Sequence, residues 1–194
     1  MILWTDIETT GLSVASDFIL EIAVLATDEN LNETFGPLHL MFRPSGGMWE
    51  QLRRNPEVVT MHAKSGLLVD LFSEEPDARL MVDPNFAAAD EALCDFLNEA
   101  VIALMEDHDE KIRLGGSGVD RFDMLFLQKW FQNFADRMHY RSVDISPFRE
   151  FARVCGLDKP SYTSPSGRTH RALDDVLDEL AEARAWRDLL MTPK

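Results

Sequence analysis

The first 42 residues of this chain contain three apolar segments separated by short polar turns. The segments run from Ile2 to Ile7, from Phe18 to Thr27 and from about Glu33 to Phe42. Short apolar runs that are bounded by Gly, Asp, Asn or Ser are typical of β-strands. Three such strands in succession predict an antiparallel meander at the start of the fold.

Beyond residues 44–47, Pro-Ser-Gly-Gly, the pattern changes to helices and isolated short strands. We expect short helices near Asn55 and at 65–72, followed by an acidic surface loop at 73–84. The remaining expected elements are helices at 85–105, 121–134, 147–155 and 169–190, and strands at 111–114 and 142–145. This order predicts an α/β protein in which helices flank a mixed five-stranded sheet. The 194 residues contain no linker and no repeat, so we expect a single domain over 1–194.

Composition and charge exclude several classes of protein. A net charge of -15 argues against tight, non-specific binding to long duplexes, because affinity for phosphates comes largely from Lys and Arg. The chain has no run of about 18 apolar residues. It starts without a basic segment and cleavage site, so we expect a cytoplasmic protein that does not enter a membrane. Cys94 and Cys155 are too few and too far apart to indicate a disulfide framework or a zinc site.

Two acidic residues, Asp6 and Glu8, lie in the first predicted strand, within Trp-Thr-Asp-Ile-Glu-Thr-Thr-Gly-Leu at 4–12. Because side chains alternate along a strand, both carboxylates should leave one face while Ile7 points into the opposite layer. Carboxylates suit hard divalent cations, and two such cations can stabilise the attacking and leaving oxygens of a phosphodiester displacement. Alone, an Asp-x-Glu pair is more often structural or solvated, so the assignment depends on other residues.

A second candidate group lies in Gly-Arg-Thr-His-Arg-Ala-Leu-Asp-Asp at 167–175. If Thr169 caps the last helix, His170 lies at its start and Asp175 in its second turn, so that both can face one site. Histidine can accept a proton from a metal-bound water near neutral pH. The alternative is a histidine that only caps the helix or forms a hydrogen bond.

The middle of the chain carries a third candidate in the stretch 115–127, which begins Gly-Gly-Ser-Gly. Such glycines permit close approach of a ligand backbone, and Phe122 and Phe126 would anchor the following helix. Asp120 and Asp123 are three residues apart, so on a helix they share a face. Either can complete the acidic site, and periodicity alone does not decide between them.

The three motifs resemble, in order and residue type, those of the DEDDh branch of the DnaQ-like 3′-5′ exonucleases, whose fold is ribonuclease-H-like. The resemblance spans almost the whole chain and is greatest to the oligoribonucleases. The stretches that carry this further likeness are 19–23 with 27–28, 62–67, 139–141, 144–146 and 170–176.

This resemblance implies that two Mg²⁺ or Mn²⁺ ions are bound by Asp6, Glu8, Asp123 and Asp175. It also implies that His170 is the general base. The family places an aromatic residue directly before its second aspartate and four residues between the histidine and the last aspartate. Asp123 is then preferred to Asp120, and Asp175 to Asp174. The implied activity is metal-dependent release of nucleoside 5′-monophosphates from the 3′ end of short RNA.

The same resemblance implies contacts with the substrate and with a second copy of the chain. Leu12 matches an apolar side chain that wedges between the terminal bases; the alternative is a core residue of the turn. Tyr140 and Arg141 match residues that a homodimer partner supplies; the alternative is an ordinary loop. The residues expected to bind substrate are Thr9, Gly11, Leu12, His62, Ser117, Tyr140 and Arg141. The basic residues available for one or two phosphates are His139, Arg141, Arg168 and Arg171.

The chain departs from the oligoribonuclease pattern in two places. The stretch 55–61 lacks a Trp-Asn pair before His62, and no Gln precedes Asp123 in the stretch 118–123. A broader 3′-5′ exonuclease that acts on single-stranded DNA or RNA, for proofreading or trimming, is therefore the first alternative. A catalytically inactive nucleic-acid-binding module of the same fold is the second.

Overall fold

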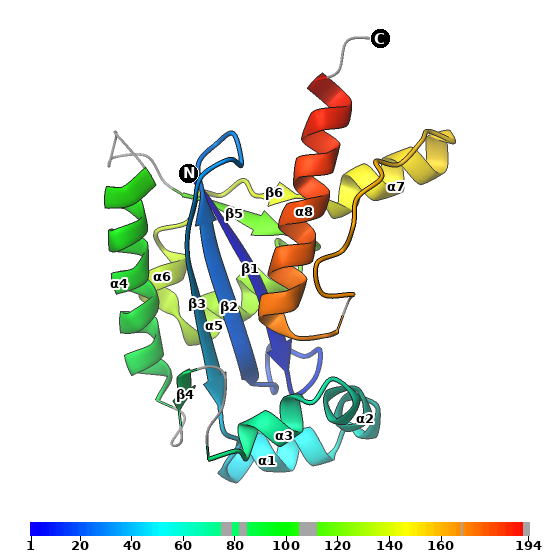
Figure 1. Cartoon of the computed structure of the whole chain (residues 1–194). Coiled ribbons are helices and arrows are strands. Elements are labelled where there is room, and N and C mark those ends of the chain that lie inside the picture. Colours follow the sequence, from blue (N-terminus) through cyan, green and yellow to red (C-terminus); the bar gives the residue numbers. More distant parts are fainter. Residues whose placement is uncertain (75–78, 82–84, 105–111, 168, 192–194) are drawn as a thin grey trace.

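The centre of the protein is a mixed six-stranded sheet, seen in a computed structural model that describes residues 1–74, 79–81, 85–104, 112–167 and 169–191 (Figure 1). In spatial order the strands are β4 (Arg79–Met81), β3 (Thr34–Phe42), β2 (Ile19–Thr27), β1 (Ile2–Thr9), β5 (Arg113–Gly116) and β6 (Val143–Asp144). The first three strands form the predicted antiparallel meander, and β4, β5 and β6 each pair in parallel with a neighbour.

The predicted mixed sheet flanked by helices is confirmed, with one strand added at its edge. We expected 73–84 to be a loop, but β4 lies within it and pairs with the end of β3. Residues 75–78 and 82–84 fall outside the described part of the chain. A three-residue edge strand has too little apolar pattern to be distinguished from a loop by sequence.

Two apolar cores pack on opposite faces of the sheet. One lies beneath α4 (Phe86–Leu104), α5 (Asp123–Trp130) and α6 (Gln132–Ala135), and it includes Leu3 and Ile7 of β1. The other lies beneath α8 (Ala172–Met191) and includes Ile2 and Trp4. Figure 1 shows α8 crossing one face of the sheet while α5 and α6 cover the other. The side chains of β1 therefore point alternately into the two cores, as the sequence pattern of this strand predicts.

The helix predicted over 121–134 is two helices in the structure. Phe131 separates them with φ −133° and ψ 63°, and it is fully buried against the rings of Phe42 and Phe86. Packing of this side chain thus outweighs the helical periodicity of the segment. None of the helices in the described residues is long and apolar enough to cross a membrane.

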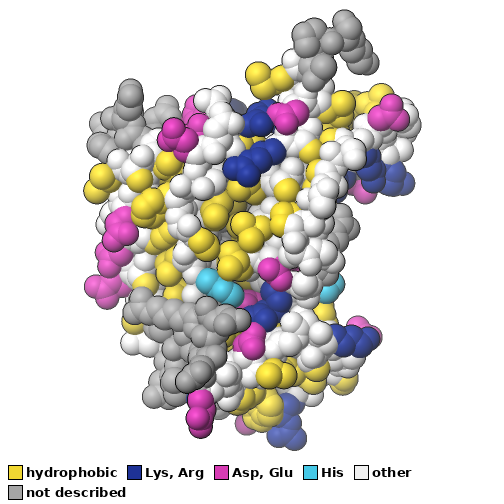
Figure 2. Space-filling model, viewed as in Figure 1, with side chains coloured by type: hydrophobic (Ala, Val, Ile, Leu, Met, Phe, Trp, Pro, Cys, Tyr) yellow, Lys and Arg dark blue, Asp and Glu magenta, His cyan; other side chains and the backbone are white. Residues whose placement is uncertain are grey.

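The remaining helices lie at the ends of the sheet. α1 (Gly46–Arg53), α2 (Pro56–Lys64) and α3 (Leu67–Leu71) gather below the end of β1, and α7 (Ser146–Cys155) follows β6 (Figure 1). The exposed face of α4 is acidic, with Glu91, Asp95 and Glu99 at four-residue spacing (Figure 2). These three acids are therefore solvated surface away from the end of β1.

Candidate active site

Asp6 and Glu8 lie in the second half of β1, on the face that also carries Trp4. Ile7 packs into the opposite core, so the predicted shared face of the two acids is present. β5 pairs with β1 only as far as Trp4. On the β5 side the sheet therefore opens beside Asp6, which is still paired with Ala23 of β2, and the side chain of Asp6 borders a cavity.

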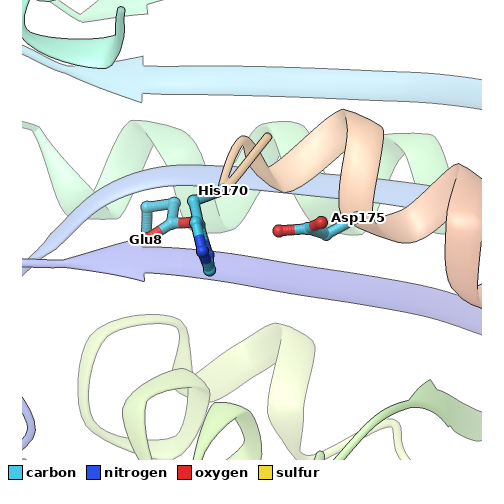
Figure 3. A group of neighbouring side chains, drawn as sticks. All are labelled: Glu8, His170 and Asp175. Atoms are coloured by element: carbon cyan, nitrogen blue, oxygen red, sulfur yellow. The ribbon is translucent and has the colours of Figure 1, made fainter. Parts of the chain in front are cut away.

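The last helix begins at Ala172, three residues later than predicted. His170 has φ 56°, in the left-handed region, which interrupts the helix before it starts. Thr169 does not cap the helix as expected; its hydroxyl donates to the side chain of Asp174. His170 is thus held outside the helix and exposed, while Asp175 projects from the first turn. Figure 3 shows Asp175 pointing toward His170, which lies beside Glu8.

Asp123 is the first residue of α5 and is almost completely buried. Asp120 lies before the helix, is exposed, and accepts a hydrogen bond of 2.6 Å from the hydroxyl of Ser142. The two aspartates therefore do not share a helix face, which corrects the expectation from their spacing. Of the two, Asp123 is the one whose charge raises the pKa of Asp6.

A cavity of about 380 Å³ joins these elements. Its described lining residues are Asp6, Ser117, Arg149, Tyr162, His170, Asp175, Asp178, Glu179 and Glu182. One ring nitrogen of His170 and carboxylate oxygens of Glu8 and Asp175 all lie within 4.8 Å of one another. Residues from both ends of the chain and from its middle therefore meet at one place.

Several carboxyls at or beside the cavity, those of Asp6, Glu8, Asp123 and Asp175, are destabilised in their charged form. Burial, followed by repulsion from Asp123 and Glu179, raises the pKa of Asp6 well above its usual range. Burial is also the main cause that raises the pKa of Glu8 to about 8, of Asp123 to about 7 and of Asp175 to about 6. Such values indicate a site that lacks positive charge.

Glu21 of β2 fixes the backbone beside His170. Its carboxylate is fully buried and accepts hydrogen bonds from the backbone N–H of Ala172 at 3.0 Å, from Nε2 of His39 at 2.7 Å and from Nε of Arg171 at 3.1 Å. Arg171 also donates to Asp70 at 2.6 Å. We expected Arg171 to contact phosphate, but both ends of its guanidinium are held by acidic residues of the protein.

His62 lies beneath the end of β1 and not on the surface. Its side chain is completely buried, and Nε2 donates to the carbonyl oxygen of Thr9 at 2.8 Å. Its Nδ1 lies 3.8 Å from Oε2 of Glu8. We expected His62 to bind substrate, but in this conformation it has no exposed atom for such a contact. Thr9 is likewise buried, with its hydroxyl donating to the carbonyl of Gly11 at 2.7 Å.

Leu12, Tyr140 and Arg141, which were also expected to bind substrate, are not among the lining residues of the cavity. Leu12 is 81% exposed, which excludes the alternative of a core residue in the turn. Tyr140 is 78% exposed, and the Arg141 guanidinium stacks on its ring at 5.0 Å. Tyr140 lines a separate hollow with Asp120, so the fold does not bring it to His170 of the same chain. Arg168 lies outside the described residues.

Gly115 and Gly116 do not form the open loop that the glycine-rich sequence suggested. Both belong to β5, where a Cβ on Gly115 would lie 2.8 Å from Ile2 and one on Gly116 would lie 3.0 Å from the carbonyl oxygen of Thr5. These glycines let β5 pack tightly against β1. Ser117, directly after the strand, reaches the cavity as expected.

One wall of the cavity consists of residues that the sequence analysis did not identify. Nη1 of Arg149 donates to Ser117 at 2.8 Å, and its Nε donates to Glu182 at 2.7 Å. Glu182 also accepts from the hydroxyl of Tyr162 at 2.9 Å and from the indole N–H of Trp186 at 3.2 Å. No local spacing relates Arg149, Tyr162 and Glu182, because they come from α7, the loop after it and α8.

Two further acids do have a sequence signal. Asp178 and Glu179 follow Asp175 by three and four residues on α8, so they lie on nearly the same helix face. Asp178 accepts hydrogen bonds from Ser164 at 2.6 Å and from Ser166 at 2.9 Å, which fixes the loop that leads to His170. Glu179 faces the cavity.

The residues present fit divalent cations. Carboxylate oxygens are the ligands that Mg²⁺ and Mn²⁺ prefer. Among the described residues that line the cavity, Arg149 is the permanent cation, and it is already bonded to Glu182 and Ser117. Oε2 of Glu179 is buried without a hydrogen-bond partner. The acids therefore exceed the positive charge that the described lining supplies, which is the condition a metal site requires.

Proteins of similar sequence are oligoribonucleases. The chain is 33% identical to the oligoribonuclease of Streptomyces griseus over 98% of this chain and 87% of that protein. It is 31% identical to the oligoribonuclease of Cutibacterium acnes, over 100% of this chain and 87% of that protein. For the oligoribonuclease of Colwellia psychrerythraea the identity is 30%, over 97% and 94%. No protein-family model matches the chain.

Solved structures of similar fold include exonuclease I of Escherichia coli. Its zinc-bound complex with single-stranded DNA matches with a TM-score of 0.63 and 17% identity, over 97% of this chain. Exonuclease I from Methylocaldum szegediense matches with a TM-score of 0.61 and 20% identity, over 96% of this chain. The matched region is 40% of the length of each of these larger proteins. The likeness establishes the ribonuclease-H-like fold of the DnaQ-type exonucleases.

The fold and the sequence relatives together define this protein as a DnaQ-like 3′-5′ exonuclease. Within that class the identity of 30% or more over almost the whole chain is decisive. The chain belongs to the oligoribonuclease family.

Proposed function

We propose that this enzyme releases nucleoside 5′-monophosphates from the 3′ end of short RNA and requires two divalent cations, Mg²⁺ or Mn²⁺. The observation that carries the proposal is the convergence of acids from β1, α5 and α8 beside His170. The name oligoribonuclease, which the relatives share, supports short RNA as the substrate.

In this proposal Asp6, Glu8, Asp123 and Asp175 hold the cations, which when bound stabilise negative charge on the attacking and departing oxygens. His170 takes the proton of the attacking water at a ring nitrogen. Its exposed position lets that proton pass on to solvent.

The rest of the site positions these groups. Glu21 anchors the backbone N–H two residues after His170, and His62 holds the carbonyl next to Glu8. Arg149, with its guanidinium at the cavity wall, offers a positive charge to a phosphate of the substrate.

The test is hydrolysis of a 5′-labelled RNA pentanucleotide with Mg²⁺ and with Mn²⁺. We expect His170→Ala to lower the rate by about 10²- to 10⁴-fold, the range of general-base catalysis. Asp6→Ala should lower it at least as far while leaving the fold intact by circular dichroism. Asp120→Ala is the matched control, since that acid lies outside the cavity. Full activity of Asp6→Ala would refute the proposed site.

A broader exonuclease on single-stranded DNA or RNA is the second candidate. It is favoured by the fold shared with exonuclease I, whose structures contain single-stranded DNA. Rates on a 5′-labelled dinucleotide, a 20-nucleotide RNA and a 20-nucleotide DNA separate the two functions. Preference for the dinucleotide supports the first, and equal or faster cleavage of the long strands supports the second.

Leu12 is the residue we assign to the terminal bases. An exposed leucine in the loop after β1 can insert an apolar side chain between two bases, which offsets the loss of their stacking. Leu12→Ala should raise KM for short RNA more than it lowers kcat. An unchanged KM would exclude this contact.

We also propose that the working unit is a homodimer in which Tyr140 and Arg141 reach the partner's substrate. Both residues are exposed and lie apart from the cavity of their own chain. A second observation is the apolar exposed side of α7 and its C-terminal end, formed by Phe151, Val154 and Leu157. Light scattering coupled to gel filtration measures the mass. Val154→Asp should yield monomers, and a monomeric wild-type protein would rule the dimer out.

A further inference from the structure

Glu179 is a buried acid with an unsatisfied oxygen at the wall of the catalytic cavity. It lies one helical turn after Asp175 on α8, and it lines the cavity together with Asp175 and Asp6. The residue is 9% exposed, and no donor of the described part of the chain reaches Oε2. A buried carboxylate oxygen without a donor is costly, so its environment requires an explanation.

The charged groups that interact with Glu179 come from five elements, and most are acidic. They are Asp6 of β1, Asp123 of α5, Asp144 of β6, Asp175 of α8 and the cation Arg149 of α7. Arg149 does not neutralise Glu179 directly, because its guanidinium donates to Glu182 and Ser117. Glu179 therefore faces a cluster of acidic side chains, and no described donor pairs with its Oε2.

The neighbouring acids of α8 differ from Glu179 because their carboxylates accept hydrogen bonds. Glu182 is bonded to Arg149 and Tyr162, and Asp178 is bonded to Ser164 and Ser166. Both carboxylates therefore already have hydrogen-bond partners within the protein. Glu179 lines the cavity with Asp6 and Asp175, and among the described residues its Oε2 has no hydrogen-bond partner.

We propose that Glu179 is a fifth carboxylate of the divalent-cation site and supplies it with an oxygen ligand. This inference rests on the proposed function, because it presumes that Asp6 and its neighbours bind cations. A bound cation would give Oε2 of Glu179 the partner that it lacks and would relieve the repulsion among the acids.

The consequence is tighter cation binding than four carboxylates provide. Removing groups that support a metal commonly lowers affinity by about 10- to 100-fold, and we expect a loss in this range for Glu179→Gln. Gln is isosteric but weaker as a ligand, so the cavity keeps its shape. Glu179→Asp keeps the charge but shortens the side chain, so it should also lose affinity if the oxygen must reach a cation.

The experiment is calorimetric titration of the full-length, metal-free protein with MnCl₂. Glu182→Gln is the matched control, because it removes one charge from the same cavity wall where the acid already has protein partners. We expect a weaker Kd for both Glu179 variants and an affinity near wild type for Glu182→Gln. Thermal melts verify that each variant is folded, and the Mn²⁺-induced rise in Tm should shrink for Glu179→Gln.

Two outcomes would overturn the inference: unchanged Mn²⁺ affinity in Glu179→Gln, or equal losses in Glu179→Gln and Glu182→Gln, which would indicate a general effect of charge. Asp6→Ala separates this inference from the proposed function. If Asp6→Ala abolishes Mn²⁺ binding while Glu179→Gln does not, the proposed site stands and the role of Glu179 fails. If Asp6→Ala binds Mn²⁺ as the wild type does, the proposed site itself is wrong.

Discussion

Glu8 and Glu21 face each other across the β1–β2 pair as register partners, yet their carboxylates have opposite environments. Burial raises the pKa of Glu21, but hydrogen bonds from His39, Arg171 and the N–H of Ala172 outweigh it and hold that pKa below its usual value. No hydrogen bond from a described residue reaches Glu8, and burial, with repulsion from Glu21, raises its pKa to about 8. One glutamate has hydrogen-bond partners within the protein, and among the described residues the other has none.

The metal-free protein should lose stability as the pH rises. The pKa values of Glu8, Asp123 and Asp175 are raised to about 8, about 7 and about 6. In the unfolded chain these groups titrate near pH 4. Between about pH 4 and pH 8 the folded state therefore binds more protons, and the free energy of unfolding falls as the pH increases.

Thermal melts with a chelator from about pH 5 to pH 9 measure this effect. We expect Tm to fall from about pH 5 to about pH 8. The pKa of Glu21 is lowered in the folded state, so its contribution to stability is lost only as the pH falls below the usual titration range of a glutamate. Glu21 therefore does not affect Tm between pH 5 and pH 9. A Tm that rises from pH 5 to pH 8 would contradict the raised pKa values.

Cation binding should release protons near neutral pH. A carboxyl must be ionised to bind a metal, and Glu8, with a pKa of about 8, is largely protonated at pH 7. Calorimetric titration with MnCl₂ in two buffers of different ionisation enthalpy counts the protons. We expect release at pH 7 that becomes much smaller at about pH 9. Equal proton counts at the two pH values would show that these acids are already ionised.

Glu21→Gln should weaken both the fold and the reaction. The change leaves Arg171 and His39 without their buried anionic partner, and loss of one member of a buried pair costs about 3–5 kcal/mol. It also loosens the start of α8, so turnover should fall at temperatures where the variant is still folded. Urea unfolding and hydrolysis of short RNA measure the two effects.

Asp70→Asn is the control for this prediction. It removes the other acidic partner of Arg171, but Asp70 is partly exposed, and such an ion pair contributes about 1 kcal/mol or less. Similar losses for the two variants would mean that Glu21 has no special part in holding the helix start.

Gly11→Ala should destabilise the loop after β1. A Cβ at Gly11 would lie 2.5 Å from Nδ2 of Asn55 and 2.7 Å from Oδ2 of Asp17. Asn55 is held by the carbonyl of Thr10, and Asp17 by the hydroxyl of Thr10, so neither can move without losing a hydrogen bond. We expect a loss of about 1–3 kcal/mol by chemical denaturation, as for other overpacked sites.

Gly47→Ala is the matched control for the loop. A Cβ at Gly47 meets only Phe18, at 3.9 Å, and Gly47 lies in α1, where Ala is the better helix former. It should be neutral or stabilising. If Gly11→Ala were equally well tolerated, the close approach of Asn55 and Asp17 would not constrain this loop.

Much of the site follows from local periodicity in the sequence. The alternation of β1 places Asp6 and Glu8 on one face with Ile7 behind them, and helical spacing brings Glu179 to the side of Asp175. These relations depend only on backbone geometry, which repeats every two residues in a strand and every 3.6 in a helix. The meander and the long helices are predictable for the same reason.

Other features needed the packed structure. From the sequence, Arg171 is expected to contact phosphate. In the structure α8 packs against β2, and Arg171 forms an ion pair with Glu21 instead. His62 looks like a contact residue, but its helix packs it beneath Thr9. The start of the last helix moves to Ala172 because Glu21, distant in sequence, accepts its N–H.

The sequence thus specified the reaction class, since the acids and the histidine stand in recognisable local patterns. Only the tertiary structure decided which charges neutralise one another. Glu8 and Glu21 are the same residue type on adjacent strands, and Glu179 and Glu182 lie three residues apart on one helix. In each pair one acid forms an ion pair with an arginine from a distant segment, and among the described residues the other forms none with an arginine or a lysine. Electrostatic energy depends on distances between packed elements, and these distances have no counterpart in the local spacing of the chain.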